Sequence, residues 1–239
     1  MISDKAIIQS DKIGNNVTIM ENVIVRSDVI IGDNVIIHPN VIIEDGAHIG
    51  NNTEIFSGTL IGKEPKGSGA LTRPINYVKI IIIGENCSVG PNAVIYCDVQ
   101  IGNNTLIGDG ASIREKVRIG NQCLIGRYVT INYNSVIGNQ TKIMDLTHIT
   151  GNCNIGKNVF ISIHVSTVND NVVVNRTYSE DDIIGPTIAD NSTIGANAII
   201  LPKVRIGVSS MVAAGSIVTK DVRDHILVLG APAKEIRTI

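Results

Sequence analysis

The stretch IGNNTLIGDGAS, residues 101–112, repeats itself after six residues. Ile101 is followed by Ile107 and Thr105 by Ala111, so an aliphatic and a small residue recur at a fixed offset. A period of six excludes helices and coiled coils, and Asn and Gly are poor helix formers. Each hexad therefore predicts one short flat strand and one corner, at which Gly or Asn would supply the unusual backbone angles of a turn.

The same hexad fills most of the chain. Nine hexads run from Ile13, fourteen from Ile83 and six from Ile188, and all 29 begin with Ile or Val. The fifth position is small or β-branched in every hexad except the one that holds Pro65. Three hexads close a triangular coil of eighteen residues, so we expect an all-β, parallel β-helix of about ten coils, roughly 45–50 Å tall. The first and fifth positions point inward and form ladders between coils.

The composition agrees with a β-rich core and narrows the class of function. The chain has 239 residues, 23 Gly, no Trp and only 2 Phe, and its formal net charge of −2 lacks the basic excess of a nucleic-acid binder. Neither a membrane span nor a signal peptide is recognisable, so we expect a cytoplasmic protein. Cys87, Cys123 and Cys153 are predicted to face inward and Cys97 to lie at a corner, and buried small side chains explain the cysteines better than metal or redox chemistry. Cys87 and Cys123 lie two coils apart, too far for a disulfide.

Two segments interrupt the repeat, at about 63–82 and 168–187. They are either tolerated surface insertions or loops that overhang the prism and shape a cleft, and loops on a rigid scaffold often carry function. We favour the functional interpretation, more strongly for the second loop. We expect a single domain over 1–239, with coils at about 7–62, 83–167 and 188–223 and a C-terminal cap at 224–239.

Residues eighteen apart should stack on neighbouring coils. One predicted column contains Asp109, Arg127, Asp145 and Ile163. The adjoining column contains Ser112, Thr130, His148 and Ser166. Asp145 and His148 share one hexad, and His164 lies in a hexad one coil above. The columns indicate either a polar site near His148 under the second loop, or an exposed ion-pair ladder beside a corner histidine, which stabilises little.

Tandem [Ile/Val]-Gly-x-x-[small]-x units over nearly the whole chain resemble the hexapeptide-repeat acyltransferases. This resemblance implies a left-handed β-helix, an exception to the usual right-handed rule, and a homotrimer. The Asn-Asp at 169–170 and the return of the chain through Pro-Thr-Ile at 186–188 resemble the projecting loop of sugar-nucleotide N-acyltransferases. The implied substrate-binding residues are Asn132, His164, Asn169, Asp170 and Arg176.

The segment THITGNCNIG, residues 147–156, ends in a Cys-x-Ile-Gly that resembles lipid A-type acyltransferases and related sugar N-acyltransferases. Those enzymes usually carry His-Asp before this Cys, with the His as general base, whereas this chain has Gly151-Asn152. His148 matches a second, substrate-contacting His of some members. Either His148 has taken over proton transfer, with Asp145 orienting the ammonium group, or no side-chain base is needed. A neutral amine is nucleophilic without help and a hydroxyl is not, which favours N-acylation.

The C-terminal segments MVAAGSIVTKDV and LGAPAKEI resemble the coenzyme A-binding end of this family. Small residues would let a pantetheine arm lie against the backbone, and Lys220, Lys234 and Arg237 would supply cations for its phosphates. Capping of the last coil is the competing interpretation, and the two are compatible. The predicted cofactor-binding residues are Gly195, Ala196, Ala213, Ala214, Gly215, Lys220 and Lys234.

The resemblance implies an acetyl-CoA-dependent N-acyltransferase acting on a TDP- or UDP-linked amino sugar, with coenzyme A and the acceptor held between subunits of a trimer. Alternatives are an amino-acid-derived acceptor such as tetrahydrodipicolinate, or a non-catalytic scaffold, which would have unbroken coils. No metal is expected, because the γ-class carbonic anhydrases of this fold need three clustered histidines and no pair here has a tight ligand spacing. Neither nucleic acid nor a membrane is an expected partner.

Overall fold

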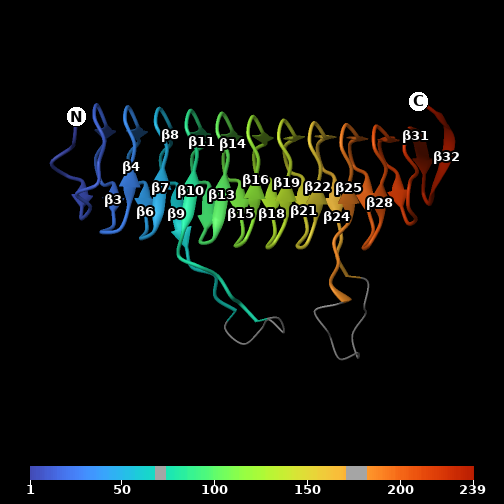
Figure 1. Cartoon of the computed structure of the whole chain (residues 1–239), viewed down its shortest axis with the longest axis horizontal. Coiled ribbons are helices and arrows are strands. Elements are labelled where there is room, and N and C mark those ends of the chain that lie inside the picture. Colours follow the sequence, from blue (N-terminus) through green and yellow to red (C-terminus); the bar gives the residue numbers. More distant parts are fainter. Residues whose placement is uncertain (68–73, 171–181) are drawn as a thin grey trace.

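Three parallel sheets form the sides of a triangular prism in a computed structural model, which describes residues 1–67, 74–170 and 182–239. The fold is a left-handed parallel β-helix with the two chain ends at opposite ends of the prism (Figure 1). Face I has 11 strands, face II has 9 and face III has 12. The prism thus has about eleven coils, close to the ten predicted. No helix in the described part is long and apolar enough to cross a membrane.

The chain visits the faces in the order I, II, III, and most strands are two residues long. Face I contains β1 (Ile7–Ile8), β3 (Ile24–Val25), β6 (Ile42–Ile43), β9 (Leu60–Lys63), β12 (Val94–Tyr96), β15 (Ser112–Ile113), β18 (Thr130–Ile131), β21 (His148–Ile149), β24 (Ser166–Thr167), β27 (Ile199–Ile200) and β30 (Ile217–Val218). Face II contains β4 (Ile30–Ile31), β7 (Ala47–Ile49), β10 (Ile81–Ile83), β13 (Val99–Ile101), β16 (Arg118–Ile119), β19 (Val136–Ile137), β22 (Asn154–Ile155), β25 (Thr187–Ile188) and β28 (Arg205–Ile206). Face III contains β2 (Thr18–Ile19), β5 (Ile36–Ile37), β8 (Glu54–Ile55), β11 (Ser88–Val89), β14 (Leu106–Ile107), β17 (Leu124–Ile125), β20 (Lys142–Ile143), β23 (Phe160–Ile161), β26 (Thr193–Ile194), β29 (Met211–Val212), β31 (Ile226–Gly230) and β32 (Ala233–Thr238).

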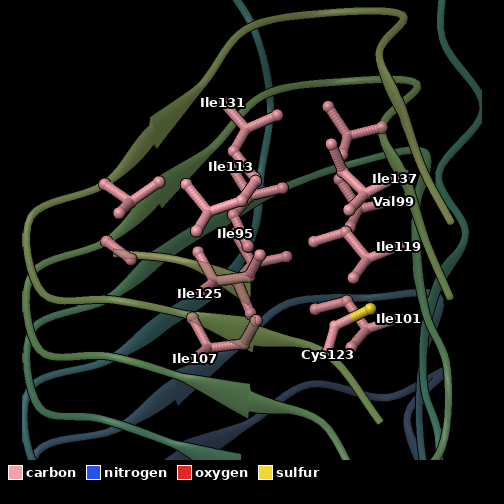
Figure 2. Close-up of a cluster of buried hydrophobic side chains, with 14 of the residues drawn as sticks. Ile95, Val99, Ile101, Ile107, Ile113, Ile119, Cys123, Ile125, Ile131 and Ile137 are labelled. Atoms are coloured by element: carbon pink, nitrogen blue, oxygen red, sulfur yellow. The ribbon is translucent and has the colours of Figure 1, made fainter. Parts of the chain in front are cut away.

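The core consists of aliphatic ladders that run along the prism axis. Ile95 pairs with Ile113, and Ile113 with Ile131, a step of eighteen residues per coil. Figure 2 shows these side chains stacked above one another and facing the ladders of the other two faces. The first and fifth positions of the hexads are buried, as predicted. Burying such β-branched side chains stabilises the fold by about 1.5–3 kcal/mol each.

The corners explain why Gly and Asn recur at fixed positions of the hexad. The fourth residue adopts the left-handed backbone region, most often as Asn, for example Asn104 with φ 56°. The glycine at the second position serves a different purpose, because a Cβ on Gly102 would lie 2.4 Å from Asn121 Oδ1 and 2.7 Å from Gly120 C in the next coil. Asn therefore provides the turn, whereas Gly permits close stacking of coils.

Small polar side chains at the fifth position are buried but hydrogen-bonded. Thr53 Oγ1 donates to Gly84 O at 2.9 Å, and Cys123 Sγ donates to Gly138 O at 3.2 Å. All four cysteines are buried and unbridged, and burial raises the pKa of Cys153 to about 12. The prediction that the cysteines are buried small side chains is confirmed.

Both interruptions leave the prism at the corner between faces I and II and project from the same side (Figure 1). The first lies between β9 and β10 and the second between β24 and β25, within two residues of the predicted bounds. At the C-terminal end, β32 folds back antiparallel on β31. This hairpin covers the last coil.

Candidate functional site

A column of polar side chains runs along the middle of face I. Ser112, Thr130, His148 and Ser166 occupy equivalent positions on four consecutive strands, which confirms the predicted column. Toward the N-terminal end, the equivalent positions are Leu60 and Val94, and toward the C-terminal end they are Ile199 and Ile217. Among the described residues, this column of face I is therefore polar only in its central part.

His148 is half-buried in this column and is held by one hydrogen bond. Its Nδ1 lies 2.7 Å from Thr130 Oγ1. Burial lowers the pKa of His148 below its ordinary value of 6.5, so the imidazole is neutral at neutral pH. If Thr130 Oγ1 accepts the hydrogen bond from Nδ1–H, Nε2 keeps its lone pair and can accept a proton from a ligand.

Asp145 lies at the corner between faces III and I and is bonded to Arg127. The carboxylate accepts hydrogen bonds from the Arg127 backbone N–H and from its Nε, both at 2.8 Å. The Arg127 guanidinium lowers the pKa of Asp145, and the pKa of Arg127 is raised in return. Asp145 is thus paired with Arg127 rather than with His148, in the manner expected of an ion-pair ladder.

The predicted acceptor-binding residues lie at both corners of face I. Asn132 is half-buried at the I–II end, and His164 is exposed at the III–I corner with φ 58°. Asn169 and Asp170 are half-buried at the base of the second loop. Arg176 lies outside the described residues.

An aromatic ring lies over Gly151, the position at which the enzymes named above usually carry the histidine base. This contact was not predicted from the sequence. The Tyr133 ring covers Gly151, so that a Cβ at 151 would lie 2.6 Å from Tyr133 Cζ. Asn169 Nδ2 donates to Gly151 O at 3.2 Å and lies 3.4 Å from the Tyr133 hydroxyl. The missing side chain at 151 is therefore replaced by an aromatic ring from the preceding coil. The eighteen-residue spacing between Tyr133 and Gly151 was the signal that could have revealed it.

The predicted coenzyme site lies at the C-terminal end of the III–I corner. Ala196 and Ala214 follow Asp145 in the same corner column, and Gly215 N donates to Ala196 O at 2.8 Å. A Cβ on Gly195 would lie 2.4 Å from Ala214 N, so only Gly lets the two coils stack here. Neither the Ala196 N–H nor the Ala214 N–H has an acceptor among the described residues. Two backbone donors thus remain available to a ligand.

The two predicted lysines lie at opposite ends of face I. Lys220 is exposed at the I–II corner after β30. Lys234 pairs in register with Leu229 on the terminal hairpin, which turns at the III–I corner near Ala214. Lys234 therefore lies on the hairpin that turns near Ala214, whereas Lys220 lies at the other corner of face I. Ala213 is half-buried and Gly215 exposed between them, with φ 69° at Gly215.

Comparison with protein families supports the repeat directly. The family described as bacterial transferase hexapeptide (six repeats) matches residues 12–45, 29–63, 80–115 and 98–133. The hexapeptide repeat of succinyl-transferase matches residues 187–220. The chain belongs to the hexapeptide-repeat family. In this hexapeptide-repeat chain, the second match covers every predicted cofactor-binding residue except Lys234.

Several curated proteins are similar to part of the chain. Serine acetyltransferase 4 of Arabidopsis thaliana is 42% identical over 91 residues, 38% of this chain and 25% of that protein. The 2,3,4,5-tetrahydropyridine-2,6-dicarboxylate N-acetyltransferase of Clostridium perfringens is 52% identical over 52 residues, 22% of each chain. The matched part thus spans about a quarter of the length of these relatives.

Two solved structures align with parts or all of the chain. A UDP-N-acetylglucosamine acyltransferase from Bacteroides fragilis aligns with all of this chain and 74% of its own, at 25% identity and a TM-score of 0.47. A mutant of perosamine N-acetyltransferase from Caulobacter crescentus, solved with CoA and GDP-perosamine, aligns over 63% of this chain and 56% of its own, at 22% identity and a TM-score of 0.45. Both TM-scores are too low to transfer a site or a ligand.

Across the described ranges, no three His, Cys, Asp or Glu side chains gather in a way that could hold a metal ion. That no metal is required stays a prediction.

Proposed function

We propose that the chain is an acyl-CoA-dependent N-acyltransferase. The observation that carries this proposal is the pair of N–H groups at half-buried Ala196 and exposed Ala214, on the corner that borders the His148 face, which have no acceptor in the described part of the chain. Backbone donors beside small side chains suit the amide-rich pantetheine arm of coenzyme A, and Lys234 suits its phosphates. The succinyl-transferase match over 187–220 and the acetyltransferase relatives support the same activity.

In the proposed reaction, the acceptor amine attacks the thioester carbonyl of the acyl-CoA. The new C–N bond forms a tetrahedral intermediate, the C–S bond then breaks, and the coenzyme A thiolate leaves. His148 accepts the proton of the amine at Nε2 and passes it to the thiolate, so protons and charge balance. Holding amine and thioester in line accounts for most of the acceleration, and an N–H near the carbonyl oxygen stabilises its developing charge.

The acceptor that we propose is an amino sugar linked to a nucleotide. The replacement of the usual base by Gly151 under the Tyr133 ring supports an amine over a hydroxyl, because an amine needs less activation. The side-chain nitrogen of Asn169, Nδ2, donates to Gly151 O and lies near the Tyr133 hydroxyl. Its side-chain oxygen would then accept a hydrogen bond from an ammonium or hydroxyl group of the ligand. Three copies around a threefold axis would give three equivalent clefts.

A second candidate acceptor is amino-acid-derived. The similarity to the Clostridium perfringens tetrahydropyridine-dicarboxylate N-acetyltransferase favours it. Such an acceptor carries carboxylates and no nucleotide. The two proposals therefore differ in the anionic groups that cations of the protein must bind, carboxylates in one and phosphates in the other.

Thiol release from acetyl-CoA tests the activity, with panels of UDP- and TDP-linked amino sugars and of amino-acid-derived amines. Turnover of one amino sugar supports the first proposal, and turnover restricted to a dicarboxylate supports the second. Acetyl-CoA hydrolysis or acetylation that is equal in protein and buffer controls contradicts both.

A further inference from the structure

Lys63 lies on β9 and Tyr96 on β12, two neighbouring strands of face I, and Arg114 directly follows β15, the next strand of that face. Lys63 is the register partner of Tyr96, and its Nζ lies 4.9 Å from the centroid of the Tyr96 ring. Arg114 Cζ lies 5.0 Å from the same centroid. The two cations therefore flank one aromatic ring and are no more than about 10 Å apart.

The two cations are held differently. Arg114 donates from Nε and a terminal nitrogen to both carboxylate oxygens of Glu115, at 2.9 and 3.2 Å, and the Glu115 side chain is only 1% exposed. The guanidinium is thereby fixed against the ring. Lys63 is exposed, and no carboxylate pairs with it in the part of the chain that the structure describes. Its neighbour Glu64 is bonded to Lys79 and to the Tyr77 hydroxyl instead.

A hollow of about 320 Å³ opens beside Lys63 at the base of the first loop. Its walls include Glu44, Gly62 and Lys79. Glu44 is paired with Arg26 at 3.2 Å, so this carboxylate does not neutralise Lys63. Asp45 and Glu64 also line the hollow, and Glu64 is bonded to Lys79. Lys63 thus lies at the edge of the hollow as an exposed ammonium group without a carboxylate partner among the described residues.

This cation pair lies beside the His148 column, two residues further along each coil, because Tyr96 and Arg114 follow Val94 and Ser112 by two positions. Arg114 follows β15 (Ser112–Ile113), which lies two strands from β21 (His148–Ile149), and Tyr96 lies one strand further away. At ~4.8 Å per strand, the ring and the guanidinium are roughly 10–14 Å from His148 along the axis. The path between them is lined by Ser112 and Thr130. A hexose ring followed by a diphosphate has a comparable length.

We propose that Lys63 and Arg114, on either side of Tyr96, bind the diphosphate of a nucleoside diphosphate-linked acceptor. The proposal rests on the proposed function for the position of the amine at His148, and it identifies where the nucleotide half of that acceptor lies. A planar guanidinium and a mobile ammonium suit neighbouring phosphate groups, and charge-assisted hydrogen bonds are stronger than neutral ones. The Tyr96 ring lies within 5.0 Å of both cations.

Calorimetric titration with UDP, with TDP and with inorganic pyrophosphate, in the absence of coenzyme A, tests this subsite. Lys63→Met keeps an aliphatic chain against the Tyr96 ring but removes the charge. We expect at least a tenfold weaker affinity for the nucleoside diphosphate that binds the unmodified chain. The matched control is Lys142→Met, on the exposed side of β20 in face III. The nucleoside diphosphate affinity of this control variant should be unchanged. Pyrophosphate that competes with UDP or TDP supports the diphosphate as the recognised group.

Unchanged nucleoside diphosphate affinity in Lys63→Met, an equal loss in Lys142→Met, or no binding of any of the three probes would overturn the subsite. A parallel titration with acetyl-CoA separates this proposal from the proposed function. Nucleoside diphosphate binding that depends on Lys63, in a chain that does not bind acetyl-CoA, would support the subsite and contradict the transferase.

Discussion

The II–III corner and the III–I corner have the same geometry but different chemistry. At the II–III corner, a backbone N–H of one coil is bonded to an Asn or Asp side chain of the next, as from Asn103 N to Asn121 Oδ1 and from Asn121 N to Asn139 Oδ1, both at 2.8 Å. At the III–I corner, the Arg127 backbone N–H donates to the Asp145 side chain in the same way. The equivalent neighbour of Ala196 is Ala214, whose side chain has no acceptor for the Ala196 N–H. The closed corner stabilises the prism, whereas the open corner leaves donors for a ligand.

The largest effect is expected from disturbing the close stacking at the closed corner. Gly102→Val would place a side chain within 2.4 Å of Asn121 Oδ1 and 2.7 Å of Gly120 C. We expect a loss of about 3 kcal/mol or more in the free energy of unfolding, measured by denaturant titration. Gly215→Ala is the matched control at the open corner, because a Cβ there meets nothing within 4 Å; its positive φ costs about 1 kcal/mol. Equal losses in the two variants would contradict this view of the corners.

Closing the open corner should abolish coenzyme binding. Ala214→Asp would offer Ala196 N–H the acceptor that Asp145 offers Arg127, and would place a carboxylate near the phosphates. We expect acetyl-CoA affinity to fall by about 100-fold, roughly 2.7 kcal/mol. The free energy of unfolding should be unchanged or slightly larger. Undiminished affinity in this variant, measured by calorimetry, would remove Ala196 and Ala214 from the coenzyme site.

His148 tests whether the polar face between the corners performs proton transfer. His148→Ala should lower kcat by more than tenfold, about 1.4 kcal/mol of barrier, if the imidazole is the base. Because burial lowers the pKa of His148 below 6.5, the neutral base persists to lower pH, and kcat/KM should fall only below that value. In His148→Ala, this fall of kcat/KM at acidic pH should be absent. A smaller change in kcat, with the fall at acidic pH retained, would mean that the amine needs no side-chain base.

The smallest effect is expected from removing one hydrogen bond of the Asn column at the II–III corner. Asn139→Ala removes the acceptor of the Asn121 N–H on an exposed corner, far along the perimeter from face I. The free energy of unfolding should fall by about 1 kcal/mol, with turnover unchanged. Lost turnover at unchanged stability would place function at the corner that we describe as purely structural.

The hexad predicted the fold because one physical constraint repeats in every coil. Ile or Val at the first position and a small residue at the fifth fill a triangular core, and the eighteen-residue column correctly placed Thr130 beside His148. The role of Gly at the second position was not predicted, because close approach between coils is a three-dimensional condition. The pairing of Asp145 with Arg127 was foreseen as one of two alternatives.

The candidate site was less predictable where loops and side-chain conformations determine which residues lie close together. Tyr133 over Gly151 depends on which way an aromatic ring turns between coils, and the sequence does not specify that. The separation of Lys220 from Lys234 follows from the reversal of the chain at the terminal hairpin. Arg176 falls outside the described residues and remains a prediction.

Calorimetric titration of the unmodified chain with acetyl-CoA tests the central claim most directly. The open III–I corner predicts saturable binding in the micromolar range, about −8 kcal/mol, that is lost in Ala214→Asp. Absence of acetyl-CoA binding to the unmodified chain would contradict the acyltransferase and leave the open corner without its proposed ligand.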